Sequence, residues 1–124
     1  MLLLQPPHET QATDKSGLEQ IESITRKYGY DFLDLSTDYE SIAGIDDSHD
    51  FADFEHLNAY GAQKLSSYIG NLVVNQYGIK SDTTGSELSR WEKSVKRTKK
   101  ALKMAGEYTD RREAQVVGAY EAAK

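Results

Sequence analysis

The sequence predicts an α/β fold, in which short parallel strands are flanked by helices and followed by a helical tail. Two short apolar runs, "LLLQ" and "YDFLDLS", have the length and composition of buried strands and predict strands at residues 2–6 and 31–35. A helical pattern separates them, so strand, helix and strand follow one another within about 36 residues, which is the size of a βαβ unit. The strands of such a unit are parallel.

The first helix is predicted at residues 16–28. Ser16 and Glu19 have the spacing of a capping box, and Gly29 is a suitable residue for the helix end. The apolar side chains between them recur every three or four residues, which is the spacing of one helix face; they are Leu18, Ile21, Ile24 and Tyr28.

Two further helices are predicted in the second half of the chain. Asn58 can cap a helix over 58–77, and Thr84 with Glu87 forms a second capping box that begins a helical tail near residue 85. In the tail, Trp91 belongs to a row of apolar residues and is expected to anchor the tail on the rest of the domain. Gly106 is expected to interrupt that row.

Length and charge divide the chain into one small domain and a tail. A chain of 124 residues is long enough for a single core. Residues 1–80 hold 13 acidic and 5 basic side chains, a net charge of −8, whereas residues 81–124 hold 7 acidic and 10 basic side chains, a net charge of +3. The sequence therefore predicts a domain portion at 1–80 and a basic helical tail at 81–124.

Several functions are excluded or disfavoured by composition. The absence of cysteine excludes disulfides and thiolate metal sites. The basic run "KSVKRTKKALK" contains no aromatic residue, so it is interpreted as a solvated helix face, and we expect no nucleic-acid partner. The apolar start "MLLLQPP" is too short for a signal peptide or a membrane span, so the sequence predicts no membrane segment and leaves the compartment undecided, with the cytoplasm as the default.

Asp53 and His56 form the one pair with an evident chemical use. They lie three residues apart in "DFADFEHLN", directly after the second strand and its polar loop, and loops that follow parallel strands form the reactive edge of α/β folds. A carboxylate within about 3.2 Å of one imidazole nitrogen fixes the tautomer and leaves the other nitrogen to act as a base. The alternative is that Asp53 belongs to a solvated acidic loop and that His56 only precedes a helix.

The same loop contains a second group of acidic residues. Asp46, Asp47 and Asp50 with His49 could bind a divalent cation, but they lack the regular spacing and the glycine of a calcium loop. We interpret them as a solvated loop and predict neither a metal site nor a cofactor. His8, after the first strand, is interpreted as an exposed loop residue.

The stretch "DFADFEHLNAYGAQKLSSYIGNLV" resembles the last conserved block of the SGNH (GDSL-type) hydrolases, in which D-x-x-H-L-N precedes a Gly-Ala and an amphipathic helix. The resemblance covers residues 1–80. It implies the C-terminal part of a flavodoxin-like, three-layer fold, with Asp53 as orienting acid, His56 as general base and Asn58 as cap and local support. It also implies small esters or O-acylated carbohydrates as substrates.

The sequence departs from this family where the nucleophile should be. It contains no Gly-Asp-Ser turn and no G-x-S-x-G, and none of its serines at 36, 41, 66 and 67 has an elbow setting. The chain is thus expected to supply only the Asp-His pair of an ester hydrolase or acyl transferase and to be inactive alone.

The alternative function is a non-catalytic remnant or interaction module that uses the tail helix. Two strands alone would leave a sheet edge exposed. We expect self-association or another subunit to cover this edge, or else a fragment of poor stability.

Overall fold

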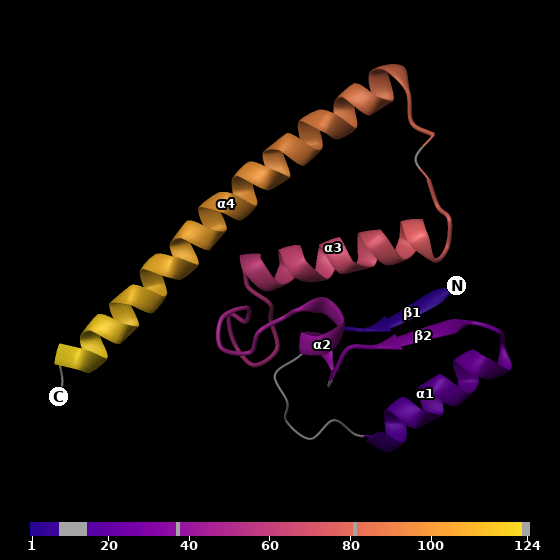
Figure 1. Ribbon diagram of the computed structural model, residues 1–124, viewed down its shortest axis with the longest axis horizontal. Coiled ribbons are helices and arrows are strands. Elements are labelled where there is room, and N and C mark those ends of the chain that lie inside the picture. Colours follow the sequence, from indigo (N-terminus) through magenta and orange to yellow (C-terminus); the bar gives the residue numbers. More distant parts are fainter. Residues whose placement is uncertain (8–14, 37, 81, 123–124) are drawn as a thin grey trace. The chain divides into compact units, whose positions relative to one another are not determined.

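The computed structural model describes residues 1–7, 15–36, 38–80 and 82–122. It contains two strands and four helices in the order β1, α1, β2, α2, α3, α4 (Figure 1). The chain divides into two compact units, Met1–Leu57 and Asn58–Lys124. The predicted division at residue 80 is based on net charge, whereas these two units are defined by packing. The division at residue 80 therefore stays a prediction.

The first unit is built on a parallel strand pair. β1 (Leu2–Gln5) and β2 (Asp31–Asp34) are paired in register from Leu2 with Asp31 to Gln5 with Asp34. Helix α1 (Lys15–Lys27) connects them and packs against β2 (Figure 1). The turn that follows α1 contains Gly29, whose φ of 69° is in the left-handed region that glycine adopts without strain. The predicted strand, helix and parallel strand are confirmed at these residues.

The core of the first unit follows directly after β2. Leu35 and Ile45 are fully buried, and Tyr39, the first residue of the short helix α2 (Tyr39–Ala43), is almost fully buried. The Tyr39 ring makes an edge-to-face contact with Phe51, with 5.7 Å between the ring centres. Tyr39 also donates a hydrogen bond from its hydroxyl to Asp47. The polar segment after β2 is thereby folded back around a small apolar centre.

The second unit consists of two helices. α3 (Ala59–Asn75) has 17 residues and α4 (Gly85–Ala122) has 38. Both begin within a residue or two of the predicted positions. α4 continues without a break through Gly106, which is the position where we expect the apolar row to be interrupted. Trp91 is largely exposed rather than a buried anchor.

The predicted fold class is wrong. A flavodoxin-like, three-layer fold needs several parallel strands with helices on both faces, but the described residues form only a two-stranded sheet with four residues in each strand. The chain is mostly helical, and α4 alone is longer than both strands together. The physical reason lies in residues 38–57, which are rich in polar and turn-forming side chains. This segment forms α2 and one isolated antiparallel bridge, Phe51 with Leu57, and it adds no further strand to the sheet.

No helix in the part of the chain that the structure describes combines the length and the apolar character needed to cross a membrane.

Candidate functional site

Asp53 and His56 lie in a tight loop that the backbone closes. Phe51 and Leu57 form an antiparallel bridge, and the Ala52 N–H donates to the His56 carbonyl oxygen at 2.7 Å. The loop therefore brings its third and sixth residues onto the same short arc, which is the local reason why a D-x-x-H spacing places the two side chains in contact.

The two side chains are in hydrogen-bond contact. The distance from His56 Nδ1 to Asp53 Oδ1 is 2.8 Å, so the predicted contact is confirmed. With Nδ1 bonded to a carboxylate, the neutral imidazole carries its proton on Nδ1 and presents a lone pair at Nε2. This is the arrangement that a general base requires.

Asp53 Oδ1 is held by more than the imidazole. The same oxygen accepts the backbone N–H of Glu55 at 3.0 Å and that of His56 at 2.9 Å. The Glu55 hydrogen bond, followed by the one from the His56 side chain, holds the pKa of Asp53 below its ordinary value. Asp53 therefore remains a carboxylate to lower pH than an unpaired aspartate.

Solvent limits the strength of this pair. The side chain of Asp53 is 58 % exposed and that of His56 is 71 % exposed. In the Ser-His-Asp triad of serine proteases the orienting aspartate is buried, and the low dielectric around it strengthens its interaction with the imidazole. The two side chains are thus in contact but open to water, which weakens their electrostatic interaction.

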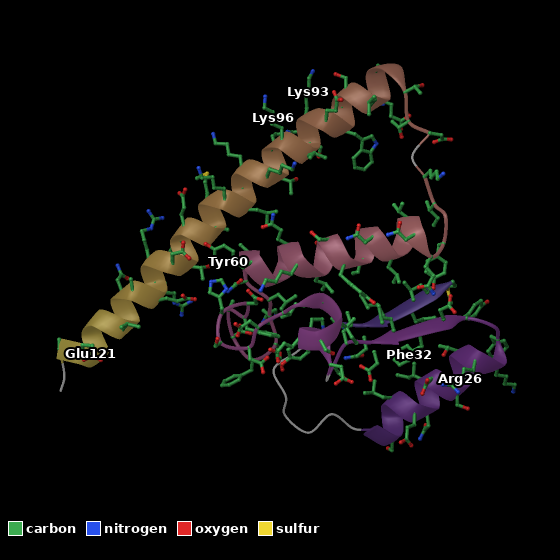
Figure 2. The ribbon with its side chains drawn as sticks, viewed as in Figure 1. Arg26, Phe32, Tyr60, Lys93, Lys96 and Glu121 are labelled. Atoms are coloured by element: carbon green, nitrogen blue, oxygen red, sulfur yellow. The ribbon has the colours of Figure 1, made fainter. Side chains whose placement is uncertain are left out.

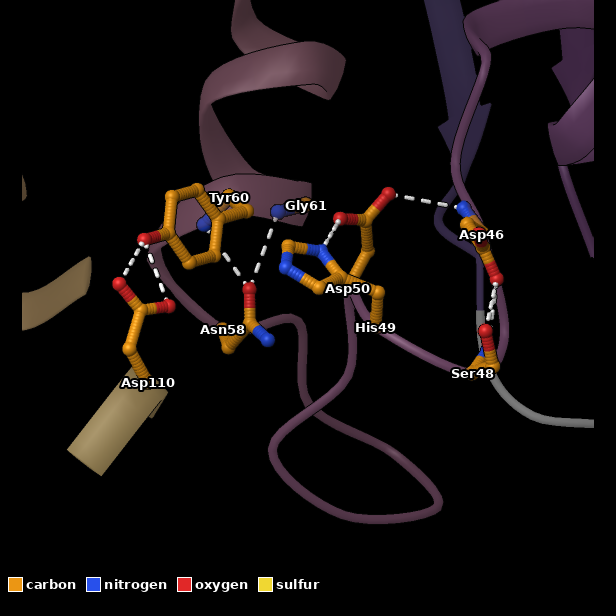
Figure 3. Close-up of polar contacts among 8 residues, drawn as sticks. All are labelled: Asp46, Ser48, His49, Asp50, Asn58, Tyr60, Gly61 and Asp110. Atoms are coloured by element: carbon orange, nitrogen blue, oxygen red, sulfur yellow. Dashed lines mark hydrogen bonds and ion pairs between the residues drawn. The ribbon is translucent and has the colours of Figure 1, made fainter. Parts of the chain in front are cut away.

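Asn58 caps helix α3. Its side-chain oxygen accepts the N–H groups of Tyr60 at 2.8 Å and Gly61 at 3.2 Å (Figure 3). The sequence-based assignment of this residue as a helix cap is confirmed. Its support of the Asp-His pair stays a prediction, because Asn58 belongs to the second unit.

A second histidine and aspartate are in contact, which the sequence analysis did not anticipate. His49 Nδ1 lies 2.9 Å from Asp50 Oδ1, and Asp50 Oδ2 accepts the N–H of Asp46 at 2.8 Å (Figure 3). Asp50 is completely buried, so the interpretation of this segment as a solvated loop is wrong for that residue. It is a structural carboxylate, which satisfies the turn at residues 46–50 from inside. The only sequence feature that could have indicated its burial is its place directly before the apolar Phe51 in an otherwise polar stretch.

The described residues contain no group of three or more His, Asp or Glu side chains placed to hold a metal ion. His8 lies outside the described residues. Ser36, at the end of β2, is completely buried, and its hydroxyl has no hydrogen-bond partner among the described residues. It is therefore not presented to a substrate as a nucleophile.

In the second unit, Tyr60 connects α3 to α4. Its hydroxyl donates to the Asp110 carboxylate, with distances of 2.8 and 2.9 Å to the two oxygens (Figure 3). This hydrogen bond, together with desolvation, raises the pKa of Tyr60. A groove of about 580 Å³ borders Tyr60, and its lining includes Gln63, Lys99 and Lys103.

Comparisons of the chain with protein-family models, with curated proteins and with solved structures find no significant match. A function for the chain is therefore inferred from the residues of the site together with the resemblance in its sequence.

Proposed function

We propose that Asp53 and His56 are the orienting acid and the general base of a serine ester hydrolase or acyl transferase of the SGNH type, of which this chain supplies one portion. The observation that supports the proposal most directly is the 2.8 Å contact between His56 Nδ1 and Asp53 Oδ1. It leaves Nε2 as the atom that would accept the proton of a serine hydroxyl attacking an acyl carbon.

The division of labour follows from the residues that are present. Asp53 holds the imidazole in one tautomer and stabilises the imidazolium that forms when His56 takes a proton. The nucleophile and the oxyanion donors, which provide most of the acceleration in acyl transfer, have to come from residues outside this sequence. Small esters and O-acylated carbohydrates are the substrate classes that the resemblance suggests.

The orientation of His56 can be tested directly by NMR. Long-range ¹⁵N–¹H correlations distinguish the Nδ1–H tautomer from the Nε2–H tautomer in neutral histidine. We expect His56 to be in the Nδ1–H form in the native chain and to shift toward the Nε2–H form in Asp53→Ala, which removes the accepting oxygen. An unchanged tautomer in that variant would remove Asp53 from the role of orienting acid.

Activity provides the second test. The purified chain should hydrolyse an activated acetyl ester no faster than its own His56→Ala variant. In a longer protein that joins this sequence to a Gly-Asp-Ser turn, His56→Ala should reduce the rate on the order of 10³-fold or more. Equal activity of that longer protein with and without His56 would refute the proposal. His49→Gln is the matched control, because it removes a histidine from the other His-Asp contact.

The alternative is an interaction module that uses the tail helix. It is favoured by the exposure of apolar side chains along α4, including Trp91, Met104 and Tyr108. The two functions differ in their dependence on His56, which an interaction through α4 does not require.

A further inference from the structure

One face of α4 carries a row of cationic side chains. At about 100° per residue, six cations fall within about 60° of Arg97 around the helix axis. We call this the basic face; its members are Arg90, Lys93, Arg97, Lys100, Arg111 and Arg112, all exposed. With a rise of about 1.5 Å per residue, the row is about 33 Å long.

The basic face contains no acidic residue. The six acidic residues of α4 lie about 80° or more from Arg97 by the same geometry; they are Glu87, Glu92, Glu107, Asp110, Glu113 and Glu121. The nine Lys and Arg of α4 are thus divided between a face with no acid and a flank where acids are present. Alternating signs are typical of a helix face that is simply solvated, and the basic face does not show this alternation.

Two exposed apolar side chains lie in the middle of the basic face. Met104 is 59 % exposed and Tyr108 is 63 % exposed, and both fall within about 20° of Arg97. Their i,i+4 spacing places them side by side on the helix surface. Apolar contact area and positive charge are therefore presented together, in one direction.

The packing of α3 leaves this face open. Gly106 and Asp110, which contact Tyr60 of α3, lie on the other side of α4. Figure 2 shows Lys93 projecting from α4 on the side away from α3. A flat partner can consequently reach the whole row without displacing α3.

The cations also repel one another. Lys93 with Arg97, and Arg97 with Lys100, are like charges at i,i+4 and i,i+3, which destabilise an isolated helix by a few tenths of a kcal/mol per pair. An anionic partner would remove this cost, so the charge pattern of the helix is complementary to a negatively charged surface.

We propose that the basic face of α4 binds an anionic lipid surface, with the helix lying in the plane of the interface. The cations contact lipid phosphates, while Met104 and Tyr108 enter the boundary between headgroups and acyl chains, where amphipathic aromatic rings are favoured. A nucleic-acid backbone would satisfy the same cations but offers no apolar layer for the thioether of Met104, and so it is the less complete match.

The test is vesicle co-sedimentation of the full chain at physiological ionic strength. Vesicles of phosphatidylcholine containing phosphatidylglycerol should bind the chain, and vesicles of phosphatidylcholine alone should not. The affinity should fall steeply as salt is added. Equal binding to both vesicle types, or binding to neither, would overturn the proposal.

Two double variants with the same net charge test whether binding depends on the basic face in particular. Lys93→Gln with Lys100→Gln removes two cations from the basic face, whereas Lys99→Gln with Lys103→Gln removes two from the opposite side of the same helix. Each cation near an anionic surface changes the affinity by roughly a factor of five, so the first variant should bind about 25-fold more weakly. The second should change little, because the helix is wider than the Debye length. Equal losses would refute a specific face.

Two further measurements separate lipid from other anions. Tyr108→Ser should weaken vesicle binding while circular dichroism shows an unchanged helix content. Binding of a fluorescent single-stranded RNA is measured in the same buffer. If the RNA binds more tightly than the anionic vesicles and depends on Lys93 and Lys100, the partner is a nucleic acid and the lipid proposal is wrong.

Discussion

Tyr60, in the first turn of α3, donates a hydrogen bond to Asp110 of α4, fifty residues further along the chain. One turn before Asp110, Gly106 packs directly beneath the same tyrosine: a Cβ atom at Gly106 would lie 3.0 Å from the Tyr60 ring and hydroxyl. A glycine in the middle of a helix costs about 0.5–1 kcal/mol relative to alanine. The close approach of Tyr60 explains why this position has no side chain.

The first prediction compares two glycines of α4. Gly118→Ala should stabilise the helix by about 0.5–1 kcal/mol, because nothing lies within 4 Å of the added Cβ. Gly106→Ala should not give this gain, since its Cβ presses on Tyr60 and disturbs the hydrogen bond to Asp110. Urea unfolding followed by circular dichroism measures both. A gain of the same size at the two positions would contradict the role of the Tyr60 contact.

The second prediction concerns the titration of Asp53. Its pKa is lowered first by the Glu55 N–H and then by the His56 side chain. In His56→Gln the pKa of Asp53 should therefore rise but stay below that of an unpaired aspartate, as followed by carboxyl ¹³C shifts. Because the folded pKa is the lower one, this group stabilises the fold above its unfolded pKa of about 3.9, and the contribution is lost as the pH falls through the folded value.

The control for that titration is the pH dependence of stability. Asp53→Asn keeps a side-chain oxygen but cannot ionise. The free energy of unfolding of this variant should therefore decrease less than that of the native chain as the pH falls below about 4. An Asp53 resonance that titrates at the same pH with and without His56 would show that the side-chain contact is not maintained in solution.

The third prediction tests the N-cap of α3. Asn58→Ala removes the acceptor for the N–H groups of Tyr60 and Gly61 and should destabilise the chain by about 1 kcal/mol, whereas Asn58→Asp should retain most of the cap. Thermal unfolding of both variants decides the matter. Equal losses of stability in the alanine and aspartate variants would mean that the side-chain NH₂ group of Asn58, rather than its oxygen, has the stabilising role.

Local elements of this chain could be predicted from sequence because their signals are local. The two apolar runs, the helix end at Gly29 and the cap at Asn58 each depend on residues within one or two turns. The contact between Asp53 and His56 was predictable for the same reason, since the residues that form it lie within one short loop.

The fold class was not predictable in that way. Whether two strands belong to a wide sheet depends on strands elsewhere, and the inference of a three-layer fold came from a resemblance rather than from residues that could form those strands. The burial of Asp50 was not predicted because its hydrogen-bond partners, the Asp46 N–H and the His49 ring, come within reach only when the turn has formed. The close approach of Tyr60 to Gly106 could not be anticipated either, because the two residues are distant in sequence.

The last prediction concerns Ser36. Its N–H donates to Asp34 at 2.8 Å, but its buried hydroxyl has no partner among the described residues. Burying a hydroxyl without a hydrogen bond costs about 1–3 kcal/mol, so Ser36→Ala should be neutral or should stabilise the chain by about 1 kcal/mol in urea unfolding.

Ser36→Val is the companion variant, because it replaces the hydroxyl with methyl groups and should lose part of that gain to overpacking. If Ser36→Ala instead destabilises the chain by more than about 1 kcal/mol, the hydroxyl makes a hydrogen bond in solution. If it abolishes a His56-dependent esterase activity, Ser36 is the nucleophile of this chain, and the assignment of the nucleophile to residues outside the sequence is wrong.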